Sequence, residues 1–355
     1  MQLFNATAVP ARIRVNAGEP GQLGIGVLTA KATFRFDRHG RVALDTQSPW
    51  PLFEQDHLTP LGVLPGERPA CRGRRFEVML LGHAYAGRGR SAREIEVRLT
   101  VGHERRALWV SGDRTWVRRF GRAPVFTTPL PFERMPLDYE HAFGGTAAVE
   151  LDTNSQLDVS HPINPRGRGF DASAFLDGLE GWLGAPRGYP RLTDDSRALP
   201  NVEHPETRIT RWDDAPEPAG FAPGAADIAV QHLARVRRGA AAAEPTSTPD
   251  PDELFYRAHS DLVIELPPAG AGVRLENLCA DQRAIEFALP DLSVIADYII
   301  YGRQGQRELR PYALVLLPDE SGFYICYGAA FSFEPGPARE RAFRLRLASG
   351  WCAPG

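Results

Sequence analysis

The residues best suited to chemistry are two carboxylates and a histidine in the middle of the chain, Asp138, Glu140 and His141. A carboxylate beside an imidazole can perform general acid–base catalysis when the two lie within hydrogen-bond distance. On a strand, however, His141 points away from the face that Asp138 and Glu140 share. We therefore favour a structural role, in which these polar side chains hydrogen-bond the backbone of a loop.

The surrounding segment, Pro131–Phe170, is expected to be one long loop, because it is rich in Gly and Pro and has almost no apolar periodicity after Phe143. Loops of this length are usually functional or disordered, and the aromatic residues at both ends favour order. Its glycines supply positive φ angles or close backbone approach. The candidate binding residues of this loop are His141, Phe143, Gly144, Gly145, Asn164, Gly167, Gly169 and Phe170.

A second group of candidates lies at the ends of expected strands: His83, Asp113, Arg114 and Trp116. We expect Asp113 and Arg114 to brace a turn together, with the indole of Trp116 packed beside them. We expect His83 to be a structural histidine, and Asn201 to suit a turn without a further role.

Sequence motifs of common catalytic and metal sites are absent. The sequence has no GxSxG, no Walker loop, no dinucleotide-binding glycine pattern, no HExxH and no CxxC. No metal and no cofactor is therefore expected. The widely spaced cysteines, expected to be free thiols in a reducing compartment, are Cys71, Cys279, Cys326 and Cys352.

The charge distribution argues against a nucleic-acid-binding protein, because the net charge is −3. Gly66–Arg122 nevertheless carries 14 arginines against 6 acidic residues, and this segment can steer an acidic partner. Lys31 is the only lysine. The N-terminus does not resemble a signal peptide, and the longest apolar runs fall well short of the roughly 20 residues that span a bilayer. A soluble, cytoplasmic protein is expected.

Alternation of apolar and polar residues predicts many strands. Leu28–Phe36 reads as a strand with one wet face that returns through Arg41–Leu44, and Glu94–Val101 forms a hairpin with Ala107–Ser111. Phe76–Tyr85 reads as a single strand that is more continuously apolar. The strands expected in the C-terminal part are Leu262–Leu266, Ala284–Leu289, Tyr312–Leu317, Phe323–Tyr327 and Ala342–Leu347.

The predicted fold is mainly β, an antiparallel sandwich or distorted barrel with long ordered loops and one or two short helices. The helices are expected at Asp171–Leu183 and Asp227–Arg238, and residues 239–252 read as a flexible linker. These signals divide the chain into a β-rich domain (1–225), a short helix with the linker (226–252), and a C-terminal β segment (253–355) that either completes the same fold or forms its own domain.

Six short motifs in a fixed order resemble a known bacterial family, the domain of unknown function 2169. The motifs are KATFRF (Lys31–Phe36), LGHAY (Leu81–Tyr85), GDRTW (Gly112–Trp116), FERMPLDYEHAFGG (Phe132–Gly145), NPRGRGF (Asn164–Phe170) and LPNVEHP (Leu199–Pro205). After the linker, Tyr256–Asp261 departs from the family pattern. The resemblance implies an association with type VI secretion, as an adaptor or chaperone that binds an effector toxin and loads it onto the valine-glycine-repeat spike. It implies no catalytic residues.

Two other classes of function stay open. An enzyme, either a hydrolase or a carbohydrate-active protein, would use His141 or His161 with Asp138 or Glu140. A small-ligand or glycan-binding β-domain would need an exposed aromatic platform, for which the candidates are Trp50, Trp116 and Trp212. We favour the non-enzymatic adaptor.

Overall fold

The computed structural model describes residues 2–16, 23–59, 62–67, 75–119, 122–152, 155–170, 197–211, 214–224, 256–334 and 341–348. Within these ranges the protein is built from strands and two short 3-10 turns, η2 (Ser260–Leu262) and η3 (Pro318–Glu320). The predicted mainly-β class is confirmed. Both expected helices and the expected linker at 239–252 lie outside the described residues.

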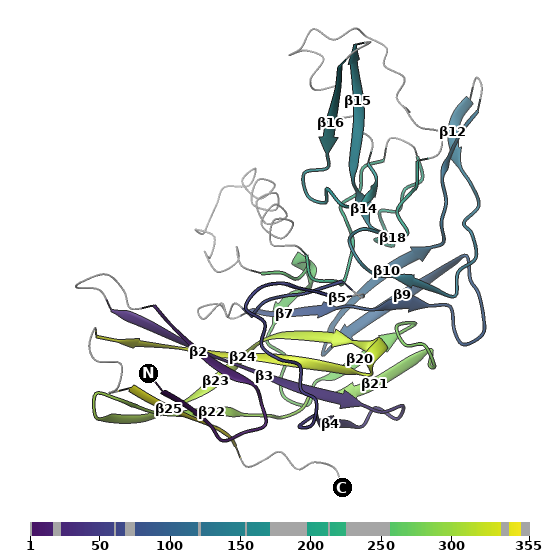
Figure 1. Cartoon of the computed structure of the whole chain (residues 1–355). Helices are drawn as coiled ribbons and strands as arrows, with labels where there is room; N and C mark the ends of the chain where they lie inside the picture. The colour runs from purple at the N-terminus through teal and green to yellow at the C-terminus, as the bar shows by residue number, and fades with distance from the viewer. Residues whose placement is uncertain are drawn as a thin grey trace.

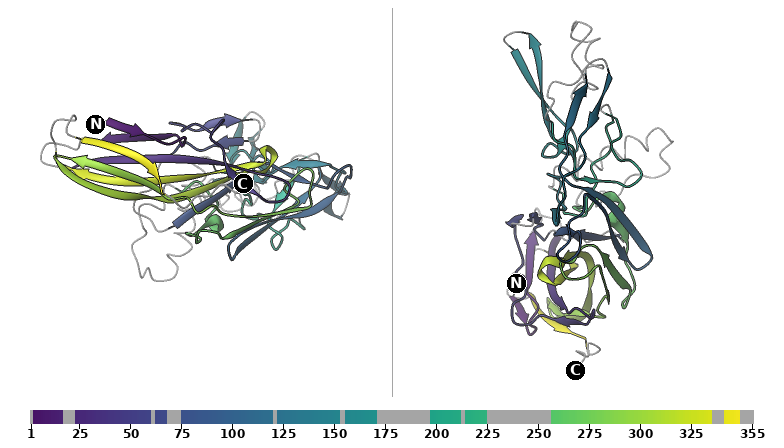
Figure 2. Two further views of the ribbon diagram at one scale, coloured as in Figure 1. Left: turned by 90° about the horizontal axis from the view of Figure 1, so that it is seen from below. Right: turned by 90° about the vertical axis from the view of Figure 1, so that its right-hand side faces the viewer.

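The largest sheet among the described residues has ten strands and curls into a nearly closed barrel (Figures 1 and 2). The order along its main path is β1-β25-β22-β23-β24-β3-β2, while β4 pairs with β3, β7 with β23 and β19 with β7. The strands of this sheet are β1 (Gln2–Asn5), β2 (Ala11–Asn16), β3 (Gly24–Phe36), β4 (Val42–Leu44), β7 (Arg75–Leu80), β19 (Val263–Glu265), β22 (Val294–Ile300), β23 (Arg303–Leu317), β24 (Gly322–Phe333) and β25 (Arg341–Leu347).

A second sheet packs against the barrel, and two hairpins project from one end of the molecule (Figure 1). In order, the second sheet contains β18 (Val202–Glu203), β10 (Glu104–Ser111), β9 (Glu94–Val101), β20 (Gly272–Glu276) and β21 (Ala284–Ala288). The projecting hairpins are β11 (Trp116–Arg119) with β12 (Arg122–Phe126), and β15 (Thr146–Asp152) with β16 (Ser155–Ser160). The remaining pairs are β5 (His57–Thr59) with β6 (Gly62–Leu64), β8 (His83–Tyr85) with β13 (Arg134–Pro136), and β14 (Phe143–Gly144) with β17 (Arg168–Gly169).

Strand β23 connects the N-terminal and C-terminal parts of the chain. Its first half pairs with β22 and its second half pairs in parallel with β7, while its other edge pairs with β24. The change of partner occurs around Pro311, next to a bulge, where a residue without a backbone N–H is tolerated. Strands from the N-terminal and C-terminal parts of the sequence therefore lie side by side within both sheets.

Four stacked aromatic rings join the barrel to the second sheet. The ring of Phe287 on β21 lies 5.0 Å from Phe36 and 5.1 Å from Phe323, and Phe323 lies 5.1 Å from Phe34. All four side chains are buried. Aromatic residues bury more apolar area than most side chains, so this stack forms the centre of the core.

The prediction that β3 has one wet face is wrong. Lys31 is fully buried on that face, because Pro51, Phe53 and Glu67 lie against its side chain. Its ammonium donates to the carbonyl of Pro51 at 2.7 Å, pairs with the buried Glu67, and lies 4.4 Å from the ring centroids of Phe53 and Tyr324. The only lysine of the chain thus attaches a long covering segment to the barrel.

A second polar anchor attaches the segment that follows the predicted linker. The guanidinium of Arg257 forms two hydrogen bonds with Asp56, at 2.8 and 2.9 Å, and a third with the carbonyl of Gly224. The carboxylate of Glu77 on β7 accepts the backbone N–H groups of Arg257 and Ala258. Of the residues that depart from the family pattern, Tyr256, Arg257 and Ala258 are therefore buried and fixed.

Three further expectations need correction. Thr146–Asp152 and Ser155–Ser160 are the paired strands β15 and β16 rather than loop, since their backbones form an antiparallel ladder. Phe76–Tyr85 is two strands, β7 and β8, separated at Leu81 and Gly82. The sheets are not wholly antiparallel, because the pairs β1–β25, β7–β23 and β14–β17 are parallel.

Replacing Lys31 by Met should lower the free energy of unfolding by roughly 3–5 kcal/mol, because Glu67 would keep a buried charge without its cation. The double variant Lys31→Met/Glu67→Gln removes that charge and keeps an acceptor for the Phe53 N–H, so it should recover part of the loss. Urea unfolding of both variants measures this. Equal midpoints for the single and double variants would contradict the prediction.

Glu77 should make stability depend on pH. Burial raises its pKa to about 7, against the lowering effect of the hydrogen bonds from Arg257 and Ala258. Because the folded-state pKa is raised, its contribution is complete below the ordinary glutamate value of 4.5 and is lost as pH rises through about 7. Relative to Glu77→Gln, the wild type should lose up to roughly 3 kcal/mol across this window.

Urea midpoints at a series of pH values compare wild type, Glu77→Gln and the control Glu265→Gln. Glu265 is exposed on the neighbouring strand β19, so its substitution should leave the pH profile unchanged. A Glu77→Gln profile parallel to that of the wild type would refute this role for Glu77.

Candidate functional site

Asp138 and His141 meet at the start of the candidate region. Their side chains share a hydrogen bond of 2.6 Å, and the His141 N–H also donates to the Asp138 carboxylate. The expectation that His141 points away from Asp138 is wrong, because residues 138–141 form a turn rather than a strand. Burial raises the Asp138 pKa, but the hydrogen bonds from His141 outweigh it and hold the pKa below its usual value.

The two other candidates for acid–base chemistry have different surroundings. His161 is buried, and its Nδ1 accepts the N–H of Asn164 at 3.0 Å while its ring lies edge-on to Phe143 and Phe170, 5.3 Å from each. The Glu140 carboxylate is exposed and lies 4.0 Å from the guanidinium of Arg166. His161 thus serves packing, and Glu140 faces solvent.

Asn164 organises the backbone around it. Its Nδ2 donates to the carbonyls of Tyr139 at 2.7 Å and Phe143 at 3.0 Å, and its own carbonyl accepts the Gly145 N–H at 2.8 Å. The N–H of Phe170 in turn donates to the carbonyl of Gly144. The AFGG and NPRGRGF motifs are therefore two halves of one hydrogen-bonded unit, and their short parallel strands are β14 and β17.

The glycines of this unit are required by close packing. At Gly144, which has φ +145°, a Cβ would collide with the carbonyl of Asn164. At Gly169, with φ +91°, it would lie 2.7 Å from the proline ring of Pro200. A Cβ at Gly145 would collide with the carbonyl of Gly167, and one at Gly167 would collide with the side chain of Asn164. The expectation of close backbone approach holds, and the approach is between segments of this chain.

Asn201 joins this unit to the second sheet, a role that the sequence reasoning missed. Its Nδ2 donates to the carbonyl of Ser111 and to the carboxylate of Asp113, both at 3.0 Å, and its Oδ1 accepts from Arg168 at 2.9 Å. Its backbone N–H donates to the carbonyl of His141 at 2.8 Å. We call the connected residues 138–145, 161–170 and 199–203 the motif junction.

Arg114 pairs with Glu203 instead of bracing a turn with Asp113. Both partners of the Arg114–Glu203 pair are buried, and the second carboxylate oxygen of Glu203 accepts the Ile209 N–H at 2.7 Å. Burial raises the Glu203 pKa above its usual value despite the opposing effect of Arg114. Trp116 is buried and packs edge-on against Phe126.

His83 lies on the barrel side of the junction, where it is held as a structural histidine. Its Nδ1 is 2.6 Å from the carboxylate of Asp319, which also accepts the Tyr85 hydroxyl at 2.9 Å.

Of the cysteines, Cys279 and Cys326 are free thiols, and burial raises the pKa of each to about 12.

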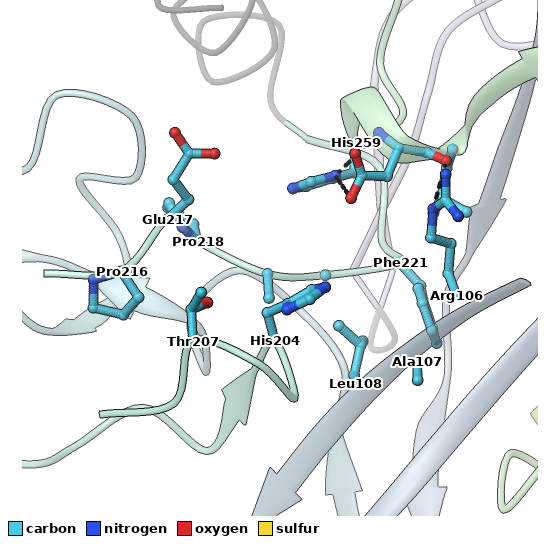
Figure 3. Close-up of a pocket in the computed structure, with 14 residues that line it drawn as sticks. Arg106, Ala107, Leu108, His204, Thr207, Pro216, Glu217, Pro218, Phe221 and His259 are labelled. Carbon is cyan, nitrogen blue, oxygen red and sulfur yellow. Dashed lines mark hydrogen bonds and ion pairs between the residues drawn. The ribbon is translucent and has the colours of Figure 1, made fainter. Parts of the chain in front are cut away.

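A pocket of about 330 Å³ lies beside the motif junction (Figure 3). Leu108 of β10 and Phe221 contribute apolar walls, and His204 from the LPNVEHP motif lies between them and Thr207. His204 directly follows Glu203, so the buried pair with Arg114 also fixes this wall. The sequence reasoning did not find this pocket, because apart from His204 its walls come from segments without a motif that are far apart in the sequence.

The opposite wall of the pocket belongs to the segment after the predicted linker. His259 and Asp261 line it, and the Asp261 carbonyl accepts a hydrogen bond of 3.0 Å from Arg106 on β10. The backbone N–H of Leu80 on β7 donates to the Phe221 carbonyl at 2.7 Å, which fixes the floor. The pocket is thus a preformed, mostly apolar cavity with polar groups at its rim, a combination typical of binding sites.

The other aromatic candidates form no platform with this pocket. Trp50 lies over Arg35, 4.3 Å from its guanidinium carbon, and Trp212 lies outside the described residues. In the described ranges no cluster of three or more His, Cys, Asp or Glu side chains could hold a metal ion. The helices in those ranges are all too short to cross a membrane.

Comparison with protein families gives one match, which covers residues 22–327. The matching family is described as an uncharacterized protein conserved in bacteria, domain of unknown function 2169. The chain belongs to this family. All six motifs lie within the matched range, so the residues of the motif junction are part of the family region. No curated protein and no solved structure matches the chain.

Replacing Gly144 by Ala should destabilise the protein more than replacing a glycine in an open turn. Gly302 in the β22–β23 turn has φ +75°, and a Cβ added there would meet no atom within 4 Å, so Gly302→Ala should cost about 1–2 kcal/mol of backbone strain. Gly144→Ala adds the collision with Asn164 and should cost at least about 2 kcal/mol more. Equal losses in urea unfolding would show that the junction relaxes freely.

Proposed function

We propose that this protein is a non-enzymatic adaptor that binds a type VI secretion effector and helps to load it onto the valine-glycine-repeat spike. The observation that carries the proposal is the apolar pocket of Figure 3, whose wall is placed by motif residues. The resemblance of the family to such adaptors supplies the partner class. Loading precedes secretion, so the proposal places the protein in the bacterial cytoplasm.

The pocket suits a protein partner more than a reaction. Leu108 and Phe221 offer apolar surface for one anchoring side chain of the partner, and such anchors contribute most of the affinity in protein interfaces. The polar groups at the rim, His204, His259 and Asp261, can orient the main chain that follows the anchor.

The one acid–base pair of the junction lies in a different environment. Asp138 and His141 make contact, but among the described residues no hydroxyl or thiol hydrogen-bonds the His141 ring, and neither side chain lines the pocket of Figure 3. Their hydrogen bonds close the turn that receives Asn201. We assign the pair a structural part in the adaptor.

Filling the pocket should abolish partner capture. Thr207 is an exposed lining residue, so Thr207→Trp places an indole in the cavity without disturbing the core. Thr128→Trp is the matched control, because Thr128 is exposed and does not line the pocket. Tagged wild type and both variants are expressed in the native bacterium, and bound proteins are identified by mass spectrometry.

We expect a toxin-like or spike protein with the wild type and with Thr128→Trp. With Thr207→Trp we expect recovery lower by at least on the order of tenfold, down to the background of the assay, as for the loss of a buried anchor. Equal recovery with all three proteins would refute the role of the pocket. Absence of any such partner from the wild type would refute the adaptor.

A further inference from the structure

A second pocket, of about 450 Å³, lies between two turns that have no residue in common with the pocket of Figure 3. One wall is the turn between β8 and β9, which carries the GRGR sequence Gly87–Arg90. The other is the turn between β20 and β21, Asn277–Arg283. This pocket lies next to the LGHAY motif, because Ala86 directly follows β8.

Three guanidinium groups line the pocket, and each is exposed: Arg88, Arg90 and Arg283. Within the ranges that the structure describes, these side chains make no hydrogen bond or ion pair. Arginines on the neighbouring strands behave differently, since Arg98 pairs with Glu96 and Glu276, and Arg274 with Glu276 and Glu286. The sole acidic side chain lining the pocket is Asp281, so the wall carries a net positive charge.

Hydrogen bonds hold the turn between β20 and β21 to the strands on either side of the GRGR turn. The Asn277 carbonyl accepts the Tyr85 N–H at 2.9 Å, and the Asn277 side chain donates to the carbonyl of Glu96 at 2.8 Å. Gln282 donates to the carbonyl of Arg38 at 2.8 Å. The β20–β21 wall is therefore fixed relative to β8 and β9, which lowers the entropy lost when a ligand binds.

The GRGR turn takes its shape from its glycines. Gly87 has φ +100° and Gly89 has φ +63°, and no atom lies within 4 Å of a Cβ built on either. Backbone conformation alone, and not lack of space, calls for glycine at these positions. The turn thus presents Arg88 and Arg90 outward with open space around them.

We propose that this pocket recognises an acidic peptide segment of a protein partner. Guanidinium groups bind carboxylates in a planar, bidentate geometry. Arginines on two separate turns match carboxylates spaced along an extended chain. Such a peptide can place its carboxylates beside the arginines and its uncharged backbone beside Asp281, whereas a compact anion such as phosphate concentrates its charge in one place. The inference deepens the proposed adaptor function, on which it rests for the identity of the partner as an effector or spike protein.

The test uses the purified full-length protein and a fluorescein-labelled oligoglutamate peptide, titrated by fluorescence anisotropy at low salt. The pocket variant combines Arg88→Gln, Arg90→Gln and Arg283→Gln. The control variant removes the same charge from three exposed arginines outside the pocket, through Arg41→Gln, Arg303→Gln and Arg344→Gln. Thermal unfolding confirms that both variants are folded.

We expect the pocket variant to weaken the apparent Kd on the order of tenfold or more, the control variant to weaken it much less, and added salt to weaken binding to the wild type. An equal effect of both variants would overturn the proposal in favour of nonspecific charge attraction. Displacement of the peptide by inorganic phosphate at equal charge concentration would overturn it in favour of a phosphate site.

Thr207→Trp separates this inference from the proposed function, because it should leave oligoglutamate binding unchanged while it abolishes partner capture. Loss of oligoglutamate binding in Thr207→Trp would show that the two pockets do not act independently and would overturn the assignment of the peptide to this pocket. Failure of the wild type to bind the peptide overturns the inference alone.

Discussion

The structure of the motif junction depends on hydrogen bonds to its buried backbone. Each buried N–H and C=O group needs a partner. Irregular backbone is rarely buried, because it lacks the regular partners that strands provide. In this protein two asparagine side chains provide them, Asn164 for the turn around Tyr139 and Phe143, and Asn201 for the end of β10. An amide group is suited to this task because it both donates and accepts. The projecting hairpins and the wall of the Figure 3 pocket depend on these two residues for their position.

Buried ionic groups serve a related purpose at three places where a long segment crosses the sheets. Lys31 holds residues 50–67, Arg257 holds the segment after residue 255, and Arg114 holds the LPNVEHP motif. Buried ion pairs add little net stability, because desolvation costs offset the attraction. Their geometric demands instead select one position for each segment. In the part of the chain that the structure describes, where the only helical elements are two 3-10 turns, these contacts replace the covering layer that helices provide elsewhere.

The sequence predicted those strands whose alternation of apolar and polar residues follows directly from which face is buried. Glu94–Val101 alternates because one face meets the core, and it forms β9. The same rule failed at Lys31. Its side chain contacts Pro51, Phe53 and Glu67, and no sequence pattern connects these residues to β3. Asn201 was read as an ordinary turn residue, because its partners Ser111 and Arg168 lie far away in the sequence. The motif residues were found, but whether they face a ligand or each other was decided by tertiary contacts.

The pairing of β3 with β24 has a consequence for the synthesis of the protein. The two strands share the longest ladder of the barrel, yet they are separated by ~290 residues, and such nonlocal contacts slow folding. Until the ribosome has made β24, the edge of β3 that pairs with it has no partner strand. The partner of β1, which is β25, is made later still. The nascent chain must therefore keep a β-rich, aggregation-prone segment soluble through most of translation. By its own topology, a protein that we propose as an adaptor for another protein is expected to need help from cellular chaperones during its synthesis.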